Sequence, residues 1–376
     1  MSPAVSASFP PRVGEGPITT ALNLGPLASL PGNWRGSGFN AIWRPDNPQS
    51  EPFTQIKRYL ELNLTSDSFD FHVIPGVVPN RGLGPQQDLH LYGLHYLQRV
   101  SDADSPPFKT AGEALHIEPG LFMNVPESEQ HKEETIVRLA SIPHGVTVLM
   151  QGKNPGMVPS QGKPQIPPIF PIENLPEFNP VSPEGHGIQP VEIPAPVGKG
   201  EEHSVPENID VKNDGAGSQS NGPFPDSFQA FVNDPNSVLR NAIVDQDILG
   251  FIAINLSTEA VDSSIGNIPF LGIPNTGQEP GVPAQASNPL KANAFVYSAT
   301  ATFWIEWVAI EPPNAAKHAG PAVPPSGDVD PAHKAIEPFA GQPCYLQLQY
   351  SQVVILIFNK VLWPHVTVGT LTLSAG

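Results

Sequence analysis

Apolar and polar residues alternate, with a period of two, through most of this 376-residue chain. Such alternation predicts β-strands with one apolar face and one polar face. Helical patterns do not alternate regularly with these segments, which argues against a parallel α/β architecture. The pattern therefore predicts an all-β, antiparallel fold with few helices. The expected strands, about ten, are residues 33–43, 59–66, 69–76, 88–101, 114–125, 135–152, 248–258, 293–310, 344–358 and 361–373.

The edges of such long strands constrain how the sheet can end. An exposed edge offers unpaired N–H and C=O groups to other chains, and closure into a barrel removes it. We therefore expect one antiparallel β-barrel of about ten strands. A barrel of this size is wider than one that its own side chains fill, so it can hold a ligand. The alternative is two smaller barrels or sandwiches, one in each half of the chain.

Proline-rich segments divide the strands into groups. The chain has 47 prolines, which must lie where no ladder N–H is needed. The long segment without periodicity is expected to dock in part on a surface. The expected organisation is an irregular arm at 1–30, the first half of the barrel at 31–152, a Pro/Gly-rich insertion at 153–224, the second half at 225–376, and within it a Pro-rich loop at 311–341.

A short helix is expected in the second half, within residues 225–246. Pro235 suits a first helical position, and Asn233 or Asp234 could cap it. The two halves also share a pattern: "YLELNLTSDSFDFHVIPG" can be aligned with "FIAINLSTEAVDSSIGNIPF", and three further segments follow in the same order. An internal repeat is one interpretation; the other is that alternating strands resemble one another.

Composition excludes several classes of function. The 19 Lys and Arg residues face 36 Asp and Glu residues, for a net charge of −17. Too few cations remain to neutralise phosphates, which argues against binding to nucleic acid or to an anionic membrane surface. A single cysteine, Cys344, permits neither an internal disulfide nor a Cys-based zinc site. We expect no signal peptide, no membrane-spanning helix and a cytoplasmic location.

Two Pro-His pairs stand before alternating runs, "IPHGVTVLM" at 142–150 and "WPHVTVGTL" at 363–371. We expect each pair at a strand start, where proline sacrifices no ladder bond. His144 and His365 then head mostly apolar rows, at the rim of the interior. An imidazole there can bind a metal or haem iron, or can simply bond a neighbouring carbonyl group. The two rows contain Met150 on the first strand and Leu371 on the second.

Other polar side chains are weaker candidates. His95 alternates with leucines and could point inward, whereas His116 shares a face with Glu118 and is expected to point outward. Glu306, in "FWIEWVAI", is either a buried acid or base or, more commonly in such a pattern, a solvent-facing residue. The spacing of a multi-histidine zinc site and the usual hydrolase and nucleotide-binding motifs are missing. Whether the protein is an enzyme stays open.

The two ends of the strand-rich region resemble a known family. "LPGNWRGSGFNAIW" resembles the G-x-W first-strand signature of the calycin barrels, among them lipocalins, fatty-acid-binding proteins and the nitrobindin-like haem-binding barrels; Gly32, Trp34, Gly36 and Gly38 match it. "PHVTVGTLTL" resembles the last strand of the nitrobindin-like barrels, with His365 at the position of the proximal haem ligand. The resemblance implies a calycin-like barrel with haem iron bound to His365, and gas binding or peroxide or peroxynitrite chemistry.

Three hypotheses of function follow. The first is a haem-binding barrel with His365 as the metal ligand and Trp34, His144, Met150 and Leu371 around the cofactor. The second is a carrier, or a cofactor-free enzyme, for a small apolar molecule, with polar anchors such as His144, Glu306 or His95. The third is a structural protein that forms homo-oligomers through its Pro-rich arms.

Overall fold

The structure is a computed structural model, and it describes most of the strand-forming parts of the chain. The described residues are 17–45, 58–81, 87–103, 114–129, 132–142, 146–169, 228–258, 294–310, 338–339, 341–358 and 361–374. Within this part of the chain, no helix is long and apolar enough to cross a membrane.

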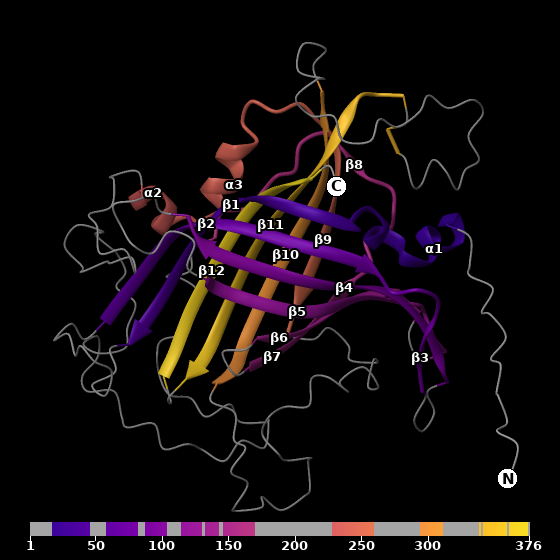
Figure 1. The fold of residues 1–376 in the computed structure, drawn as a ribbon, viewed down its shortest axis with the longest axis horizontal. Coiled ribbons are helices and arrows are strands. Elements are labelled where there is room, and N and C mark those ends of the chain that lie inside the picture. The colour runs from indigo at the N-terminus through magenta and orange to yellow at the C-terminus, as the bar shows by residue number, and fades with distance from the viewer. Residues whose placement is uncertain are drawn as a thin grey trace, which may run out of the picture.

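Ten antiparallel strands close into a single barrel (Figure 1). Around the barrel they follow the order β10, β11, β12, β1, β2, β4, β5, β6, β7, β9, and β9 pairs with β10 to complete the ring. One closed barrel confirms the all-β expectation and contradicts the alternative of two smaller domains. The strands are β1 (Gly32–Pro45), β2 (Arg58–Val73), β4 (Leu89–Asp102), β5 (Ala114–Val125), β6 (Thr135–Ile142), β7 (Val146–Lys153), β9 (Ile248–Ser257), β10 (Ala294–Ala309), β11 (Cys344–Phe358) and β12 (Val361–Leu373).

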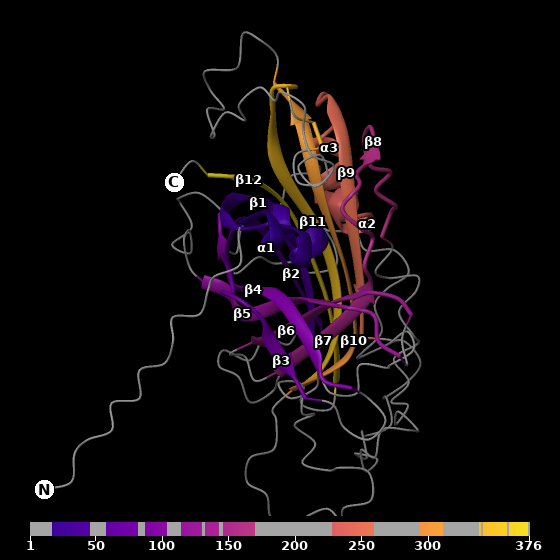
Figure 2. The same cartoon turned by 90° about the vertical axis from the view of Figure 1, so that its right-hand side faces the viewer.

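Short elements cover parts of this barrel. The strand β3 (Val78–Asn80) pairs with β4, and β8 (Ser160–Gln161) pairs with β9. The helix α1 (Pro17–Leu24) and the 3₁₀ turn η1 (Gly25–Ser29) contact β4 and β5 (Figure 2). Part of the expected irregular arm is therefore helical, because Leu24, Leu27 and Leu30 are buried in the apolar core of the barrel.

The helical segment of the second half is split into α2 (Phe228–Asn233) and α3 (Asn236–Ala242). Pro235 precedes α3 without a capping side chain, which contradicts the expected cap by Asp234. Asp234 instead accepts a hydrogen bond from the Ile169 amide (3.0 Å) and pairs with Arg240. These contacts, with Lys163 donating to the Ile243 carbonyl (2.6 Å), fasten the beginning of the Pro-rich insertion to α3.

Two strand boundaries differ from the expectation. Residues 58–73 form one continuous strand, β2, although two strands with a tight turn were expected within 59–76. Residues 135–152, expected as one strand, belong to the antiparallel pair β6 and β7. The number of barrel strands is still ten, because the two strands expected within 59–76 are one strand and the one expected at 135–152 is two.

The second Pro-His pair does not lie at a strand start. Pro364 is the fourth residue of β12 and pairs with Ile355 of β11. The pairing of β12 with β1 begins only at His365, opposite Ile42. The missing proline N–H therefore falls where β12 has a neighbour on one side only, which a strand edge tolerates.

Side chains from the inner faces of the strands form the largest apolar cluster, and a second cluster lies on the outer wall. In the outer cluster, Trp304 and Val368 pack with Leu239 of α3 and with Ile166. Figure 1 shows β9 to β12 crossing β1, β2, β4 and β5 at a steep angle, so that these two groups form opposite walls of the barrel.

The register of the strands argues against the proposed internal repeat in its first segment. The alignment places Leu62 beside Ile254. Leu62 packs in the outer cluster, whereas Ile254 packs in the inner one. Because a shift of one residue reverses the face of every side chain in a strand, aligned strands of a true repeat should agree in face.

Candidate functional site

The sequence-predicted site residues lie in different parts of the barrel. Trp34, Met150 and Leu371 are buried in the inner apolar cluster. His365 faces the same interior from β12, but six residues separate it from Leu371, which places them about 20 Å apart along the strand. The structure thus brings Trp34, Met150 and Leu371 into one cluster, and it pairs His365 with Val354, another member of that cluster. His144 lies outside the described residues.

His365 belongs to a small group of polar side chains on the inner faces of β1, β2 and β12. Its Nε2 atom lies 2.6 Å from Asn40 Oδ1 and 2.9 Å from Thr367 Oγ1. Asn40 Nδ2 in turn donates to Asn63 Oδ1 (3.3 Å), which fixes the orientation of the Asn40 amide. An amide oxygen can only accept, so Nε2 of His365 carries the proton of the shorter contact.

An ion pair between Glu118 of β5 and Arg138 of β6 lies deep in the barrel. Both side chains are 1% exposed, and Arg138 Nη2 donates to Glu118 Oε1 over 2.5 Å. Arg138 also lies over the ring of Phe303, 5.2 Å from its centroid, and donates to Gln352 Oε1 (2.6 Å). Two buried charges of opposite sign with several hydrogen bonds compensate much of the cost of their desolvation.

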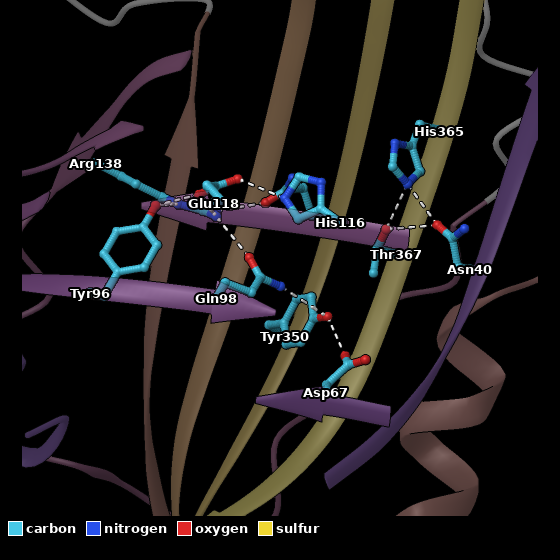
Figure 3. Close-up of polar contacts among 11 residues, drawn as sticks. Asn40, Asp67, Tyr96, Gln98, His116, Glu118, Arg138, Tyr350, His365 and Thr367 are labelled. Atoms are coloured by element: carbon cyan, nitrogen blue, oxygen red, sulfur yellow. Dashed lines mark hydrogen bonds and ion pairs between the residues drawn. The ribbon is translucent and has the colours of Figure 1, made fainter. Parts of the chain in front are cut away.

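Hydrogen bonds connect this ion pair to a second carboxyl group, as Figure 3 shows. The Tyr96 hydroxyl donates to Glu118, and Arg138 Nη2 contacts Gln98 Oε1 at 3.5 Å. Gln98 Nε2 then donates to the Tyr350 hydroxyl (3.3 Å), which donates to Asp67 Oδ2 (2.5 Å). We call these linked residues, with His116 on Glu118, the border network: Asp67, Tyr96, Gln98, His116, Glu118, Arg138 and Tyr350.

Two glycines make room for the two tyrosines of this network. A Cβ atom on Gly120 would lie 2.5 Å from the Tyr96 ring. A Cβ atom on Gly369 would lie 2.5 Å from the Tyr350 ring and 2.7 Å from Asp67 Oδ2. Such distances are far below van der Waals contact, so both positions need glycine for the tyrosines to lie flat against the wall.

The two buried carboxyl groups are held in opposite electrostatic environments. Burial raises the pKa of Asp67 to about 6, against the opposing effect of the Tyr350 hydroxyl. Burial alone would also raise the pKa of Glu118, but the charge of Arg138 outweighs it and lowers the pKa to about 2. Glu118 is therefore ionised across the physiological range, whereas Asp67 changes protonation near neutral pH.

Three buried polar atoms on the inner face of β2 make no hydrogen bond of good geometry with the described residues: Asn63 Nδ2, Thr65 Oγ1 and Asp67 Oδ1. The Thr65 hydroxyl lies close enough to the Asp67 carboxyl group to lower its pKa, against the larger effect of burial. Their residues alternate along the strand and are at most 2% exposed. A buried polar atom without a partner costs about 1–3 kcal/mol, and folded proteins rarely keep several side by side. We call the interior around this row the polar region: Asn40, Asn63, Thr65, Asp67, His365 and Thr367.

Three further candidates from the sequence differ from expectation, two in the direction that they face and one in its burial. His116, expected to point outward, lies beside Glu118 with Nε2 at 3.2 Å from Oε2. His95 points away from the interior, exposed and stacked on His72 with 5.0 Å between ring centroids. Glu306 lies on the outer wall as its pattern favoured, with Phe303 inside, yet it is buried rather than solvent-exposed.

Contacts near α3 explain the burial of Glu306. Gln347 Nε2 donates to Glu306 Oε2 (2.7 Å), and Gln246, beyond the end of α3, bonds to Gln347 in turn. Burial raises the pKa of Glu306 to about 7. The outer wall therefore holds a titratable group that is separate from the barrel interior.

Two charged residues of the border network share strand parity with apolar residues, a pattern that indicates burial and that Sequence analysis does not consider. Asp67 has the same strand parity as Phe69 and Phe71, and Arg138 the same parity as Ile136 and Ala140. A charged residue in step with apolar neighbours on a long strand indicates a buried charge. The partner of each charge is not readable in this way, because Glu118 and Arg138 are on different strands.

No family model, no curated protein and no solved structure matches this chain. Within the described part of the chain, no group of three or more His, Cys, Asp or Glu side chains is placed to hold a metal ion. Function must therefore be inferred from the barrel and its polar groups.

Proposed function

We propose that the protein binds a small molecule inside the barrel, in the polar region. The observation that carries this proposal is the row of unpartnered polar atoms on Asn63, Thr65 and Asp67. Binding sites are mostly apolar cavities with a few fixed polar groups, and the interior of this barrel combines the two kinds of surface. A ligand that supplies the missing hydrogen bonds would recover the cost of burying these atoms.

Thr65 provides a direct test, because valine has nearly the same shape without the hydroxyl group. In the ligand-free protein, Thr65→Val should raise the free energy of unfolding, since it removes an unpartnered polar atom. The same substitution should weaken binding of any molecule recovered with the protein. Mass spectrometry of the native protein and of its organic extract measures how much of the molecule is bound. Urea denaturation of the protein without the bound molecule measures the free energy of unfolding.

Thr367→Val is the matched control for this experiment. Thr367 is also buried in the polar region, but its hydroxyl group donates to Asn40 Oδ1 at 3.0 Å. Its replacement should destabilise the fold, because Asn40 loses a donor. If Thr65→Val destabilises the stripped protein as much as Thr367→Val does, the Thr65 hydroxyl has a structural partner and the proposal loses its main support.

Haem is the second candidate, favoured by the interior position of His365 on the last strand. The described residues fit haem poorly. Nε2 of His365 is bonded to Asn40 Oδ1, and two of its inner neighbours, Asn40 and Thr367, are polar. The residue opposite His365 on β11, Val354, is apolar. The aromatic rings farther inside pack against one another, with 5.4 Å between the centroids of Phe122 and Phe303.

Haemin titration decides this second candidate. Ligation by Nε2 requires the bond to Asn40 to break, so Asn40→Ala should tighten haemin binding and His365→Ala should abolish its Soret band. A Soret band that is unchanged in His365→Ala contradicts the assignment. Assembly through the Pro-rich arms stays a prediction on segments mostly outside the described residues, and light scattering tests it.

A further inference from the structure

The unpartnered atoms on β2 differ in their hydrogen-bonding character. Asn63 Nδ2 can only donate, Asp67 Oδ1 accepts when the carboxyl group is ionised, and the Thr65 hydroxyl can do both. Residues two apart on a strand are about 7 Å apart, so the row from Asn63 to Asp67 extends about 13 Å. A ligand along this row must therefore offer both donors and acceptors at several points.

The residues at the two ends of this row, Asn63 and Asp67, each make a hydrogen bond through their second polar atom. Asn63 accepts from Asn40 through Oδ1 (3.3 Å), which leaves its Nδ2 atom toward the interior. Asp67 accepts from Tyr350 through Oδ2 (2.5 Å), which leaves Oδ1. Side chains that are anchored through one atom and present another are preorganised for a ligand, because little rotamer freedom is lost on binding.

The charges of the interior disfavour an anion. Among the side chains that the structure describes, Arg138 is the one Lys or Arg on the inner face, and Glu118 neutralises it at 2.5 Å. The carboxyl group of Asp67 lies in the row itself, where an ionised ligand of the same sign would be repelled. On the part of the inner face that the structure describes, a phosphate or carboxylate ligand would find no Lys or Arg side chain outside an ion pair.

An apolar surface continues the row at one end. Phe69 follows Asp67 on the same face of β2, and its ring lies 5.6 Å from the ring of Tyr350. Ligands with hydroxyl groups along their edges and C–H groups on their faces match such an arrangement of polar groups beside aromatic rings.

We propose that the molecule bound in the polar region is a neutral polyhydroxylated compound, a small sugar or polyol, lying along β2 from Asn63 towards Phe69. This inference rests on the proposed function, since it names the class of ligand for the same site. A hydroxyl group both donates and accepts, so repeated hydroxyl groups satisfy all three atoms of the row. The length of the row suits one or two sugar rings.

The experiment compares four matched sets of probes by isothermal titration and saturation-transfer NMR. The neutral set is glucose, trehalose, maltose and myo-inositol, and the anionic set is glucose 6-phosphate and glucuronate. The cationic set is choline and spermidine, and the apolar set is hexadecanol and N-phenyl-1-naphthylamine, which carry no charge at neutral pH. We expect a neutral probe to bind. Thr65→Val should weaken it at least tenfold, and Thr65→Ser, which keeps the hydroxyl group, should restore binding.

Thr302→Val is the control, because the Thr302 hydroxyl lies on the outer wall and donates to Asn255 Oδ1 (2.9 Å). It should leave sugar binding unchanged. Protonation of Asp67 distinguishes the polyol from an amine: an acid group can still donate to a hydroxyl, so sugar affinity should vary little between pH 5 and pH 8, whereas amine affinity should fall at pH 5.

The outcomes separate this inference from the proposed function. Preferred binding of an anionic, cationic or apolar probe that is sensitive to Thr65→Val would overturn the ligand class and keep the binding function. A sugar that binds Thr65→Val as tightly as the unchanged protein would overturn the site. If none of the probes binds and no molecule is recovered with the protein, water satisfies the row and both proposals fail.

Discussion

The two regions of the barrel interior solve the problem of burial in different ways. In one region, where the aromatic side chains of the inner cluster gather, the rings contact one another directly: Phe69, Phe303 and Tyr350 have centroid distances between 5.6 and 6.3 Å. In the polar region, three buried polar atoms of β2 lack a partner among the described residues. The aromatic side chains are therefore stabilised by contacts within the fold, whereas the polar region contains buried atoms whose capacity for hydrogen bonds is not used.

The border network contains a buried charge, that of Arg138, whose hydrogen bonds and ion pair are provided by the fold itself. Arg138 contacts Glu118, Tyr96, Gln98 and Gln352, and its pKa is raised because Glu118 compensates the effect of burial. Asp67, at the other end of the network, accepts a hydrogen bond from Tyr350, and burial raises its pKa. The border network shows that this fold can satisfy buried charges, and this contrast with the row on β2 is the reason for our proposal that a ligand binds there.

Breaking the ion pair should have the largest effect. Arg138→Met leaves Glu118 buried without its cation, and we expect the free energy of unfolding to fall by about 3–5 kcal/mol. The double variant Arg138→Met with Glu118→Gln should recover part of this loss, because no uncompensated charge remains. Urea denaturation measures both. Equal loss in the single and the double variant would show that packing, rather than charge compensation, dominates the border network.

The pH dependence of stability should separate Asp67 from Glu118. The pKa of Asp67 is raised in the folded protein, so its contribution favours the fold at low pH and is lost as the pH rises from about 4 to about 6. A shift of this size corresponds to about 3 kcal/mol as an upper bound. Asp67→Asn should therefore match the parent protein near pH 4 and exceed its stability at pH 7, as followed by thermal unfolding across this range.

Two other carboxyl groups provide the controls for that measurement. Glu306, with a pKa raised to about 7 on the outer wall, should produce a similar decrease that Glu306→Gln removes, ending at a higher pH. Glu118, with a lowered pKa, stabilises the fold above its ordinary value of 4.5, and this stabilisation is lost as the pH falls towards about 2. An Asp67→Asn variant with an unchanged slope between pH 4 and pH 6 would contradict the assignment.

The glycine that faces Tyr350 should tolerate no side chain. We expect Gly369→Ala to destabilise the fold by about 1–3 kcal/mol, because the new Cβ atom would overlap Tyr350 and Asp67. It should also disturb ligand binding, since Asp67 lies in the row. Gly120→Ala, which meets Tyr96 in the same way, should destabilise comparably and leave Asp67 in place. Equal loss of ligand binding in both variants would show that the whole network, not Asp67, supports the polar region.

The smallest expected effect concerns the unpartnered hydroxyl group itself. Thr65→Val should stabilise the stripped protein by about 1 kcal/mol, because an unpaired buried polar atom is replaced by a methyl group. Thermal unfolding measured before and after removal of any bound molecule tests this. We expect Thr65→Val to stabilise the protein without its bound molecule and to destabilise the protein that still holds it. This reversal would distinguish the row on β2 most clearly from the packed aromatic side chains.

The alternation of residues was sufficient to predict the barrel. Strands β5, β11 and β12 begin and end where their patterns indicated, because a half-buried strand needs apolar residues at every second position. The pattern fails where polar residues follow one another: a turn is expected at residues 67 and 68, between "YLELNLTS" and "FDFHVIPG", yet β2 continues through them. Asp67, one of the two residues at the expected turn, belongs to the row of the proposed site.

The sequence by itself determined the all-β class and the closed barrel, since period-two patterning and the cost of open edges are local properties of each strand. Only the tertiary structure decided which polar residues meet inside it. Glu118 and Arg138 pair across two strands, and Tyr350 reaches Asp67 across 283 positions of the chain. Such contacts depend on strand order and register around the ring, which no local pattern encodes.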